Sequence, residues 1–143
     1  MKKLVIGMMV VCSLMATSVV AWCGDNGNGT VTVNGQVWLK DAGCLGYMNW
    51  DSAKSRVTSL AHGQCDLSDN SKPGDWRLPT IDELKSIYNS KSRFKDIKGY
   101  YYWSSSTRDS YTNDVWYVVM TNGHVDFTSK SSVGFVWPVR DGQ

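Results

Sequence analysis

Hydrophobic residues recur with a period of two near both ends of the chain and with a helical period in the middle. In "TVTVNGQVWL", Val31 and Val33 alternate with threonines before Asn34-Gly35, and "VWL" follows at residues 37–39. Asn-Gly favours a two-residue type I′ turn, because both residues accept a positive φ. The pattern predicts a β-hairpin over residues 30–39.

The stretch "NWDSAKSRVTSLAHG", residues 49–63, has the spacing of an amphipathic helix. Asn49 is placed to cap its start, and Gly63 offers a left-handed residue at its end. The side chains expected on its buried face are Trp50, Ala53, Val57 and Leu60.

A second helix is predicted to begin inside "GDWRLPTIDEL", residues 74–84. Pro79 fixes the approach, Thr80 is the expected N-cap, and Glu83 completes a capping box. We expect Arg77 to lie partly buried beside Trp76, with its guanidinium paired to Glu83 or Asp82 and to nearby carbonyls. The residues assigned to this structural motif are Trp76, Arg77, Pro79, Thr80 and Glu83. The residues expected on the buried face of the helix are Ile81, Leu84 and Ile87 or Tyr88.

Strand patterns dominate the rest of the chain. "YYYWSSS" at residues 100–106 is aromatic and extended, "VWYVVMTNGHVDF" at 115–127 is a second hairpin around Asn-Gly, and "GFVWPVR" at 134–140 closes the chain. Pro138 restricts the last strand to an edge or a bulge. The order of hairpin, two helices and strands predicts an α+β domain, with two helices packed on antiparallel strands and hairpins. Trp38, Trp50, Trp76 and Trp137 are expected in the core, whereas Trp103 and Trp116 are expected to approach the surface.

The first 21 residues have the composition of a signal peptide. A basic "MKK" precedes an uncharged apolar run, and small residues near Ala21 fit cleavage before Trp22. The alternative is a single membrane anchor, but the run is barely long enough to span a bilayer. We therefore predict a signal peptide over 1–21 and one domain over 22–143 with no membrane span. The protein would be exported and periplasmic, displayed at the cell surface or secreted.

Cys23, Cys44 and Cys65 remain in the predicted mature chain. Export favours disulfides. Cys44 and Cys65 lie at the two ends of the first predicted helix, so a bridge between them is the preferred pairing. Cys23 is then free or intermolecular, and a Cys23–Cys44 pairing remains the alternative.

The charges and candidate catalytic residues exclude several classes of protein. The formal net charge is +2, close to balance, which argues against a nucleic-acid binder. The two histidines, His62 and His124, have no nucleophile beside them in a recognisable pattern, and the serines at 104–106 lack a nucleophile elbow. We expect no enzymatic activity.

One segment carries candidate binding chemistry. Basic residues punctuate "KSIYNSKSRFKDIKGYYYW", with Asp96 as the one acid among them. Cations can pair with sulfate or phosphate oxygens, and aromatic rings can stack on sugar faces. The competing interpretation is a solvated loop whose aromatic residues turn inward. The candidate binding residues are Lys91, Arg93, Lys95, Lys98, Tyr100 and Trp103.

Several motifs resemble the bacterial Lcl C-terminal domain family. They are "DNGNGTVTVNGQVWLKDAGC", "WDSA", "GDWRLPTIDEL", "YYWSSS" and "VWPVR", in that order between about Asp25 and Arg140. The compact Asn34-Gly35-Gln36-Val37 stands where a longer connection ending in Thr-Gly-Leu would be expected.

The resemblance implies a C-type-lectin-like fold, which formylglycine-generating enzymes share. The copper-holding cysteines of those enzymes would lie late in the domain, and this chain has none after Cys65. Family members are secreted or surface-displayed, and one adhesin with this domain binds sulfated polysaccharides and is displayed as a trimer. A glycan or other polyanion, and a homo-oligomer, are thus the partners to consider, although a fold alone transfers no ligand. The alternative is a periplasmic structural or protein-interaction module with no sugar site. No cofactor is expected: calcium is disfavoured, because none of the three prolines stands in a Glu-Pro-Asn or Gln-Pro-Asp triplet.

Overall fold

The computed structural model describes residues 10–11 and 22–142, with side chains from residue 24 onward. It contains two five-stranded sheets, two α-helices and one 3₁₀-helix. The first sheet has the order β1 (Val10–Val11), β2 (Trp22–Asp25), β3 (Thr30–Val33), β4 (Gln36–Leu39) and β10 (Val139–Asp141). The second has the order β5 (Tyr47–Met48), β9 (Gly134–Phe135), β6 (Tyr101–Arg108), β7 (Tyr111–Val119) and β8 (Val125–Ser129). The helices are α1 (Trp50–Thr58), α2 (Ile81–Ser86) and the 3₁₀-helix η1 (Tyr88–Arg93).

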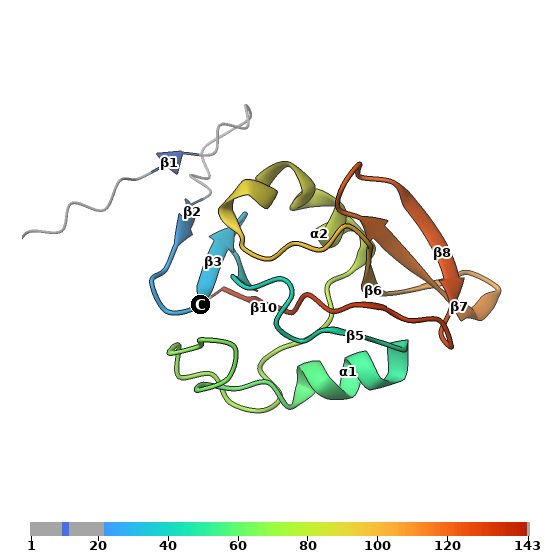
Figure 1. Ribbon diagram of the computed structural model, residues 1–143, viewed down its shortest axis with the longest axis horizontal. Coiled ribbons are helices and arrows are strands. Elements are labelled where there is room, and N and C mark those ends of the chain that lie inside the picture. Colours follow the sequence, from blue (N-terminus) through green and yellow to red (C-terminus); the bar gives the residue numbers. More distant parts are fainter. Residues whose placement is uncertain (1–9, 12–21, 143) are drawn as a thin grey trace, which may run out of the picture.

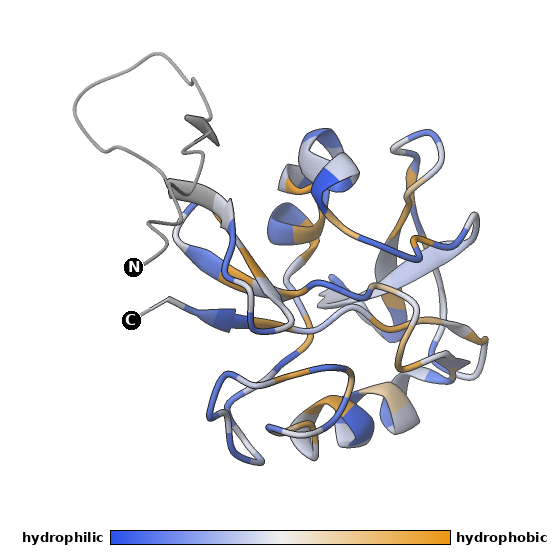
Figure 2. Ribbon diagram, turned by 60° about the vertical axis from the view of Figure 1, so that its left-hand side comes forward, coloured by the Kyte–Doolittle hydropathy of each residue, from blue (hydrophilic) through white to orange (hydrophobic). Residues whose placement is uncertain are grey.

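The predicted α+β class is confirmed. The two α-helices lie on opposite sides of the strands, with the first sheet at one end of the molecule and β6, β7 and β8 at the other (Figure 1). All strand pairs are antiparallel except β6 with β9, which is parallel. Hydrophobic and hydrophilic residues alternate along the helices, as expected for helices that cover a core on one side (Figure 2).

The first hairpin forms as predicted. Val31 of β3 pairs with Trp38 of β4, and Asn34 and Gly35 take φ values of 51° and 78°. Strand β10 pairs with the free edge of β4, through Val139 opposite Trp38. The C-terminal segment therefore crosses the molecule from the second sheet to the first (Figure 1).

Helix α1 is capped by Asn49, whose side chain accepts a hydrogen bond from the Ser52 N–H. The helix ends at Thr58, earlier than the predicted Gly63. The reason lies in the residues that follow: the N–H of Leu60 turns back to the Val57 carbonyl, while those of His62 and Gly63 bind carbonyls of the loop over residues 67–71. Leu60 is still fully buried, so its predicted place in the core is correct although it lies outside the helix.

Helix α2 begins as predicted. The Thr80 hydroxyl oxygen accepts a hydrogen bond from the Glu83 N–H, and the Glu83 carboxylate accepts one from the Thr80 N–H. The two bonds form a capping box. Leu84 and Ile87 are fully buried, while Ile81 and Tyr88 are partly buried against the core.

The four tryptophans assigned to the core, Trp38, Trp50, Trp76 and Trp137, are all buried there. The expectation for Trp103 was wrong. Its side chain is fully buried, and its indole N–H donates to the Met48 carbonyl at 2.9 Å. Trp116 is partly buried and packs edge-on against Phe127.

The predicted signal peptide falls on residues 1–21, of which only Val10 and Val11 are described. Its remaining residues lie outside the described part of the chain, and so does the Cys23 side chain. Among the described residues, no helix is long and apolar enough to cross a membrane.

Candidate functional site

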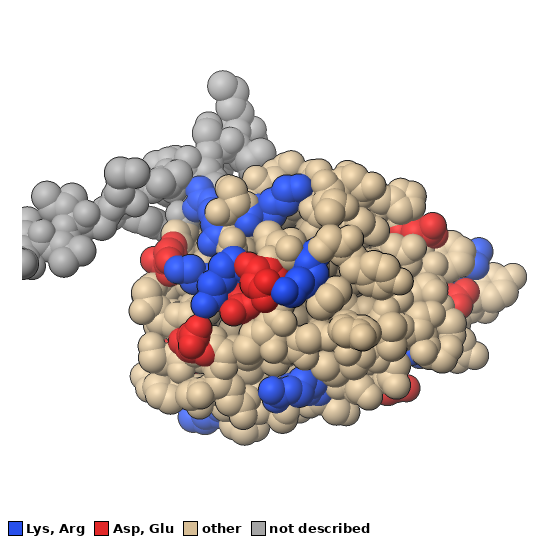
Figure 3. All heavy atoms as spheres, in the orientation of Figure 1, with Lys and Arg blue, Asp and Glu red and all other residues tan. Residues whose placement is uncertain are grey.

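Five of the six sequence-predicted binding residues lie on η1 and on the loop that joins it to β6, and the sixth, Trp103, lies in β6. We call residues 91–100 the basic segment. Lys and Arg side chains gather on the face over this part of the chain, interleaved with Asp and Glu (Figure 3). The cations of the basic segment differ in whether a carboxylate lies beside them.

Lys95 and Lys98 are matched by carboxylates. Lys95 Nζ lies 2.9 Å from Asp66 Oδ2 and 3.6 Å from Asp41 Oδ2, and Lys98 pairs with Asp96. The hydrogen bond to Asp66 is the main cause that raises the pKa of Lys95. These two lysines can meet a polyanion only in competition with their own partners.

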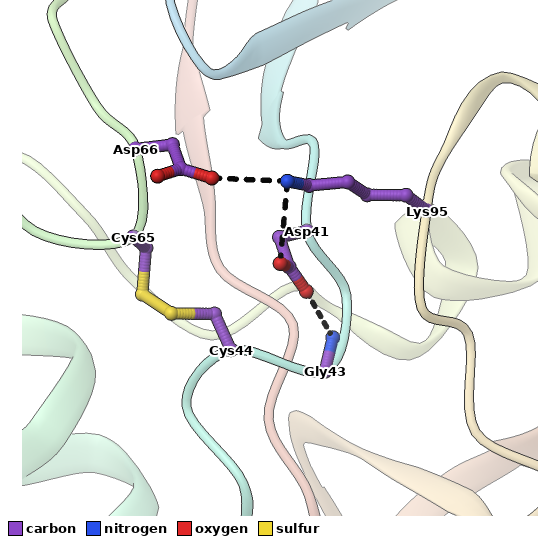
Figure 4. The surroundings of a disulfide bond; sticks show 6 residues. All are labelled: Asp41, Gly43, Cys44, Cys65, Asp66 and Lys95. Carbon is purple, nitrogen blue, oxygen red and sulfur yellow. Dashed lines mark hydrogen bonds and ion pairs between the residues drawn. A yellow bond between two sulfur atoms is a disulfide. The ribbon is translucent and has the colours of Figure 1, made fainter.

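The Cys44–Cys65 disulfide is present as predicted and lies beside this ion pair (Figure 4). Cys65 and Asp66 both adopt a positive φ, of 49° and 60°. Gly29 lets this turn approach closely, because a Cβ at that position would lie 2.5 Å from the Asp66 carbonyl oxygen. The disulfide and the close packing thus hold the Asp66 carboxylate against Lys95.

A hollow of about 270 Å³ surrounds this pair. It is polar, and a second ion pair, between Lys40 and Asp25, lies on its wall. The hydrogen bond from Lys40 is the largest cause that lowers the pKa of Asp25. Its three carboxylates outnumber its two lysines, so the hollow carries a formal charge of −1 and does not favour an anion. Its lining residues are Asp25, Gly27, Gly29, Lys40, Asp41, Cys65, Asp66 and Lys95.

Lys91 and Arg93 are not ion-paired with any described carboxylate. Lys91 Nζ donates to the Met120 carbonyl at 3.0 Å and lies 4.2 Å from the centre of the Tyr88 ring. Arg93 is partly exposed at the end of η1. The uncompensated charge of the basic segment therefore comes from these two residues.

Tyr100 ends the basic segment and is 53% exposed. Its ring stacks on Tyr101 at 4.7 Å, and Tyr101 stacks in turn on Tyr117 at 4.2 Å. We call these three residues the tyrosine stack. Tyr100 thus joins the basic segment to an aromatic surface that continues across β6 and β7. The prediction that Trp103, the sixth candidate residue, contacts a ligand was wrong, because its side chain is fully buried.

The residues considered for catalysis are separated or already engaged. His62 Nδ1 accepts the Asn70 N–H, and Ser104 is fully buried with its hydroxyl bound to the Trp116 carbonyl. His124 Nε2 lies 3.6 Å from Asp126 Oδ2, but both side chains are about half exposed. This pair lies on an open strand end, outside the three surface hollows described for the molecule.

No three His, Cys, Asp or Glu side chains of the described residues are arranged so that they could hold a metal ion. Asp114, in β7, lies 3.7 Å from Arg108 Nη1. The expectation about calcium stays a prediction.

Sequence reasoning missed Tyr101, Tyr117 and Asp126 as candidate contact residues. The signal that could have found them is strand alternation. Tyr101 and Trp103 lie on the same face of β6, because they are two residues apart. Tyr117 of β7 lies on that face as well, because it pairs directly with Trp103. That register could not be read from the sequence, because it depends on the bulges between Trp103 and Arg108.

Comparison with known proteins places the chain in a family. A search of curated proteins finds no match. The model of the Lcl C-terminal domain matches residues 29–140, which span most of the chain and include both helices, the basic segment and the tyrosine stack. The chain therefore belongs to the Lcl C-terminal domain family.

Proposed function

We propose that this protein is an exported, non-enzymatic recognition domain that binds glycans, with sulfated or otherwise anionic polysaccharides as the favoured class. It would act in the periplasm, at the cell surface or outside the cell. We also propose that its α+β architecture is a variant of the C-type-lectin-like fold. Family membership and the two helices on antiparallel strands support that assignment.

The observation that carries the proposal is the position of Tyr100. Its exposed ring follows directly after the basic segment and begins the tyrosine stack. A polysaccharide carries both anionic groups and apolar sugar faces, so a ligand that spans Tyr100 could meet a cation and an aromatic ring at once. The proposed contact residues are Lys91, Arg93 and Tyr100, with Lys95 and Lys98 in a secondary role.

The expected mode of binding is weak and dependent on salt. Exposed cations lose their attraction for sulfate as the ionic strength rises, because the Debye length falls from about 10 Å at 0.1 M to about 3 Å at 1 M salt. Several copies would then be needed for firm attachment, since linked weak sites gain by effective concentration.

Retention on a heparin column, eluted with a salt gradient, tests this proposal. Two double variants remove the same charge: Lys91→Gln with Arg93→Gln, and Lys95→Gln with Lys98→Gln. We expect the first to elute at a much lower salt concentration and the second to change little, because Asp66 and Asp96 already neutralise Lys95 and Lys98.

Equal shifts for the two variants would mean that only net charge matters. Unchanged elution of the first variant would remove the basic segment from the proposal. A protein that is not retained at all, and binds no other glycan, would favour the alternative of a structural or protein-interaction module.

A further inference from the structure

The second sheet presents three tyrosines to solvent in one stack. Tyr101 lies between Tyr100 and Tyr117, with centroid distances of 4.7 and 4.2 Å and interplanar angles of 28° and 26°. Tyr101 and Tyr117 are partly exposed, and Tyr100 is exposed. The three rings thus form one continuous aromatic surface at the edge of the core.

The stack follows from the strand register and from one glycine. Trp103 pairs with Tyr117 across β6 and β7, which places Tyr101 and Tyr117 on the same face of the sheet. Gly134 of β9 lies beneath: a Cβ at this position would be 2.4 Å from the Tyr101 ring and 3.0 Å from Trp103 Nε1. The edge of Trp103 and the bare Gly134 backbone therefore pack against Tyr101, the middle ring of the tyrosine stack.

The polar groups beside the stack are a carboxylate and hydroxyls. Asp126 pairs with Tyr117 across β7 and β8, so both side chains lie on the same face. Burial raises the pKa of Tyr117 and the nearby Asp126 raises it further. Ser132 lies near the Tyr101 hydroxyl and also contacts the Thr128 hydroxyl at 3.0 Å.

The charge on this face differs from that of the basic segment. Asp126 Oδ1 accepts the Phe127 N–H, and Oδ2 lies 3.6 Å from His124 Nε2. A carboxylate among hydroxyls repels sulfate but readily accepts hydrogen bonds from sugar hydroxyls. The carboxylate therefore disfavours an anionic occupant, and its acceptor oxygens suit the hydroxyls of an uncharged sugar.

The combination of aromatic rings, hydroxyls and one carboxylate suits a pyranose ring. The apolar C–H face of a sugar can rest on an aromatic ring, and its hydroxyls can reach polar groups at the rim. The exposed large hydrophobic residues of the described chain are Tyr47, Tyr100, Tyr111 and Val133, and of these only Tyr100 belongs to the tyrosine stack.

We propose that the tyrosine stack, together with Asp126, is a subsite for uncharged pyranose residues of a glycan, separate from the cations of the basic segment. The subsite rests on the proposed function in that its ligand is a glycan. Binding at this subsite should persist at high salt, whereas binding at the basic segment should weaken. In a glycan with both anionic and neutral sugars, the anionic groups would bind the basic segment and the neutral sugars would bind the tyrosine stack.

The test is binding of the full-length protein to a microarray of uncharged oligosaccharides in 0.5 M NaCl, roughly the range in which exposed ionic contacts are largely screened. We expect at least one neutral glycan to bind. Tyr117→Ser should weaken that binding about tenfold, a factor that corresponds to the loss of one aromatic contact. Asp126→Asn, which keeps the acceptor for Phe127, should weaken it about threefold if one hydroxyl hydrogen bond loses its charge.

Two control variants separate binding from folding. Tyr117→Phe keeps the ring and should bind within about threefold of the wild type. Tyr111→Ser removes a more exposed tyrosine that packs against Arg108, away from the stack, and should leave neutral-glycan binding unchanged. Thermal unfolding of each variant identifies any that fails to fold.

Three results would overturn this inference: no neutral glycan bound by the wild type, equal binding by Tyr117→Ser, or an equal loss for Tyr111→Ser. Dimerisation of the wild type that Tyr117→Ser abolishes would also overturn it, by assigning the face to a second copy. Heparin retention distinguishes the two proposals, since Tyr117→Ser should keep it even where neutral-glycan binding is lost.

Discussion

Arg77 Nη1 lies 3.0 Å from Glu83 Oε1, the carboxylate that also caps the start of α2. The other arm of the same guanidinium, Nη2, lies 2.9 Å from Asp141 in β10. The Arg77 backbone exchanges two hydrogen bonds of 3.0 Å with Val139. Arg77 thus ties the second helix to the C-terminal strand, and the predicted pairing with Glu83 is confirmed.

Arg77→Ala should destabilise the fold by about 1–2 kcal/mol, measured by urea unfolding. The expected loss is kept modest because the guanidinium is 40% exposed and solvent screens part of the interaction. Lys85→Ala is the control: its 3.6 Å contact with the exposed Asp82 should contribute less than about 0.5 kcal/mol. If Arg77→Ala kept full stability but lost glycan binding, Arg77 would belong to the binding site.

Glu83 predicts a pH dependence of stability. Burial raises its pKa, but hydrogen bonds from Arg77, Gln36 and Thr80 outweigh that effect and lower it overall. A carboxyl whose pKa is lower in the folded state stabilises the fold above its unfolded pKa of about 4.3, and loses that contribution as the pH falls through the folded value.

Unfolding free energies measured at neutral pH and near pH 3 should therefore differ less for Glu83→Gln than for the wild type. The variant should be the less stable protein at neutral pH, and the two should converge in acid. An equal acid-induced loss in both proteins would show that Glu83 does not contribute to it.

We expect a larger loss of stability from breaking the Asp69–Arg140 ion pair than from removing Arg77. The Asp69 side chain is 0% exposed, accepts hydrogen bonds from the Ser71 N–H and hydroxyl, and lies 3.3 Å from Arg140 Nη2. Breaking a buried pair leaves the other charge without compensation. Asp69→Ala should cost about 3 kcal/mol in chemical denaturation, whereas Asp82→Ala, at an 89% exposed side chain, should change stability little.

The disulfide gives a fourth prediction. Cys44 and Cys65 are separated by 21 positions, and closing a loop of this length stabilises by about 3 kcal/mol through the unfolded state. Replacement of both cysteines by serine should lower the free energy of unfolding by that amount, and added reductant should have no further effect. A variant as stable as the oxidised wild type would contradict this account.

The sequence predicted those parts of the fold that depend on interactions between residues close together in the chain. The first hairpin and the start of α2 were predictable because Asn34-Gly35 and the Thr80/Glu83 box specify the backbone within a few residues. The early end of α1 was not, because the N–H groups after Thr58 bind a loop whose position depends on tertiary contacts.

The candidate site was predicted only in part for the same reason. Arg93 and Tyr100 lie at the surface as expected, but the pairing of Lys95 with Asp66 joins residues 29 positions apart. The burial of Trp103 depends on β5 and β9, which arrive from distant parts of the chain: its indole N–H donates to the Met48 carbonyl, and Gly134 lies against the same ring.

A glycan microarray of sulfated and unsulfated polysaccharides, probed with the wild type and with Tyr100→Ser, tests the central claim most directly. Tyr100 is the residue shared by the basic segment and the tyrosine stack. We expect the wild type to bind a defined set of glycans, with and without a calcium chelator, and to leave them chemically unchanged. We expect Tyr100→Ser to bind them about tenfold more weakly. Failure of the wild type to bind any glycan, or equal binding by Tyr100→Ser, would contradict the account.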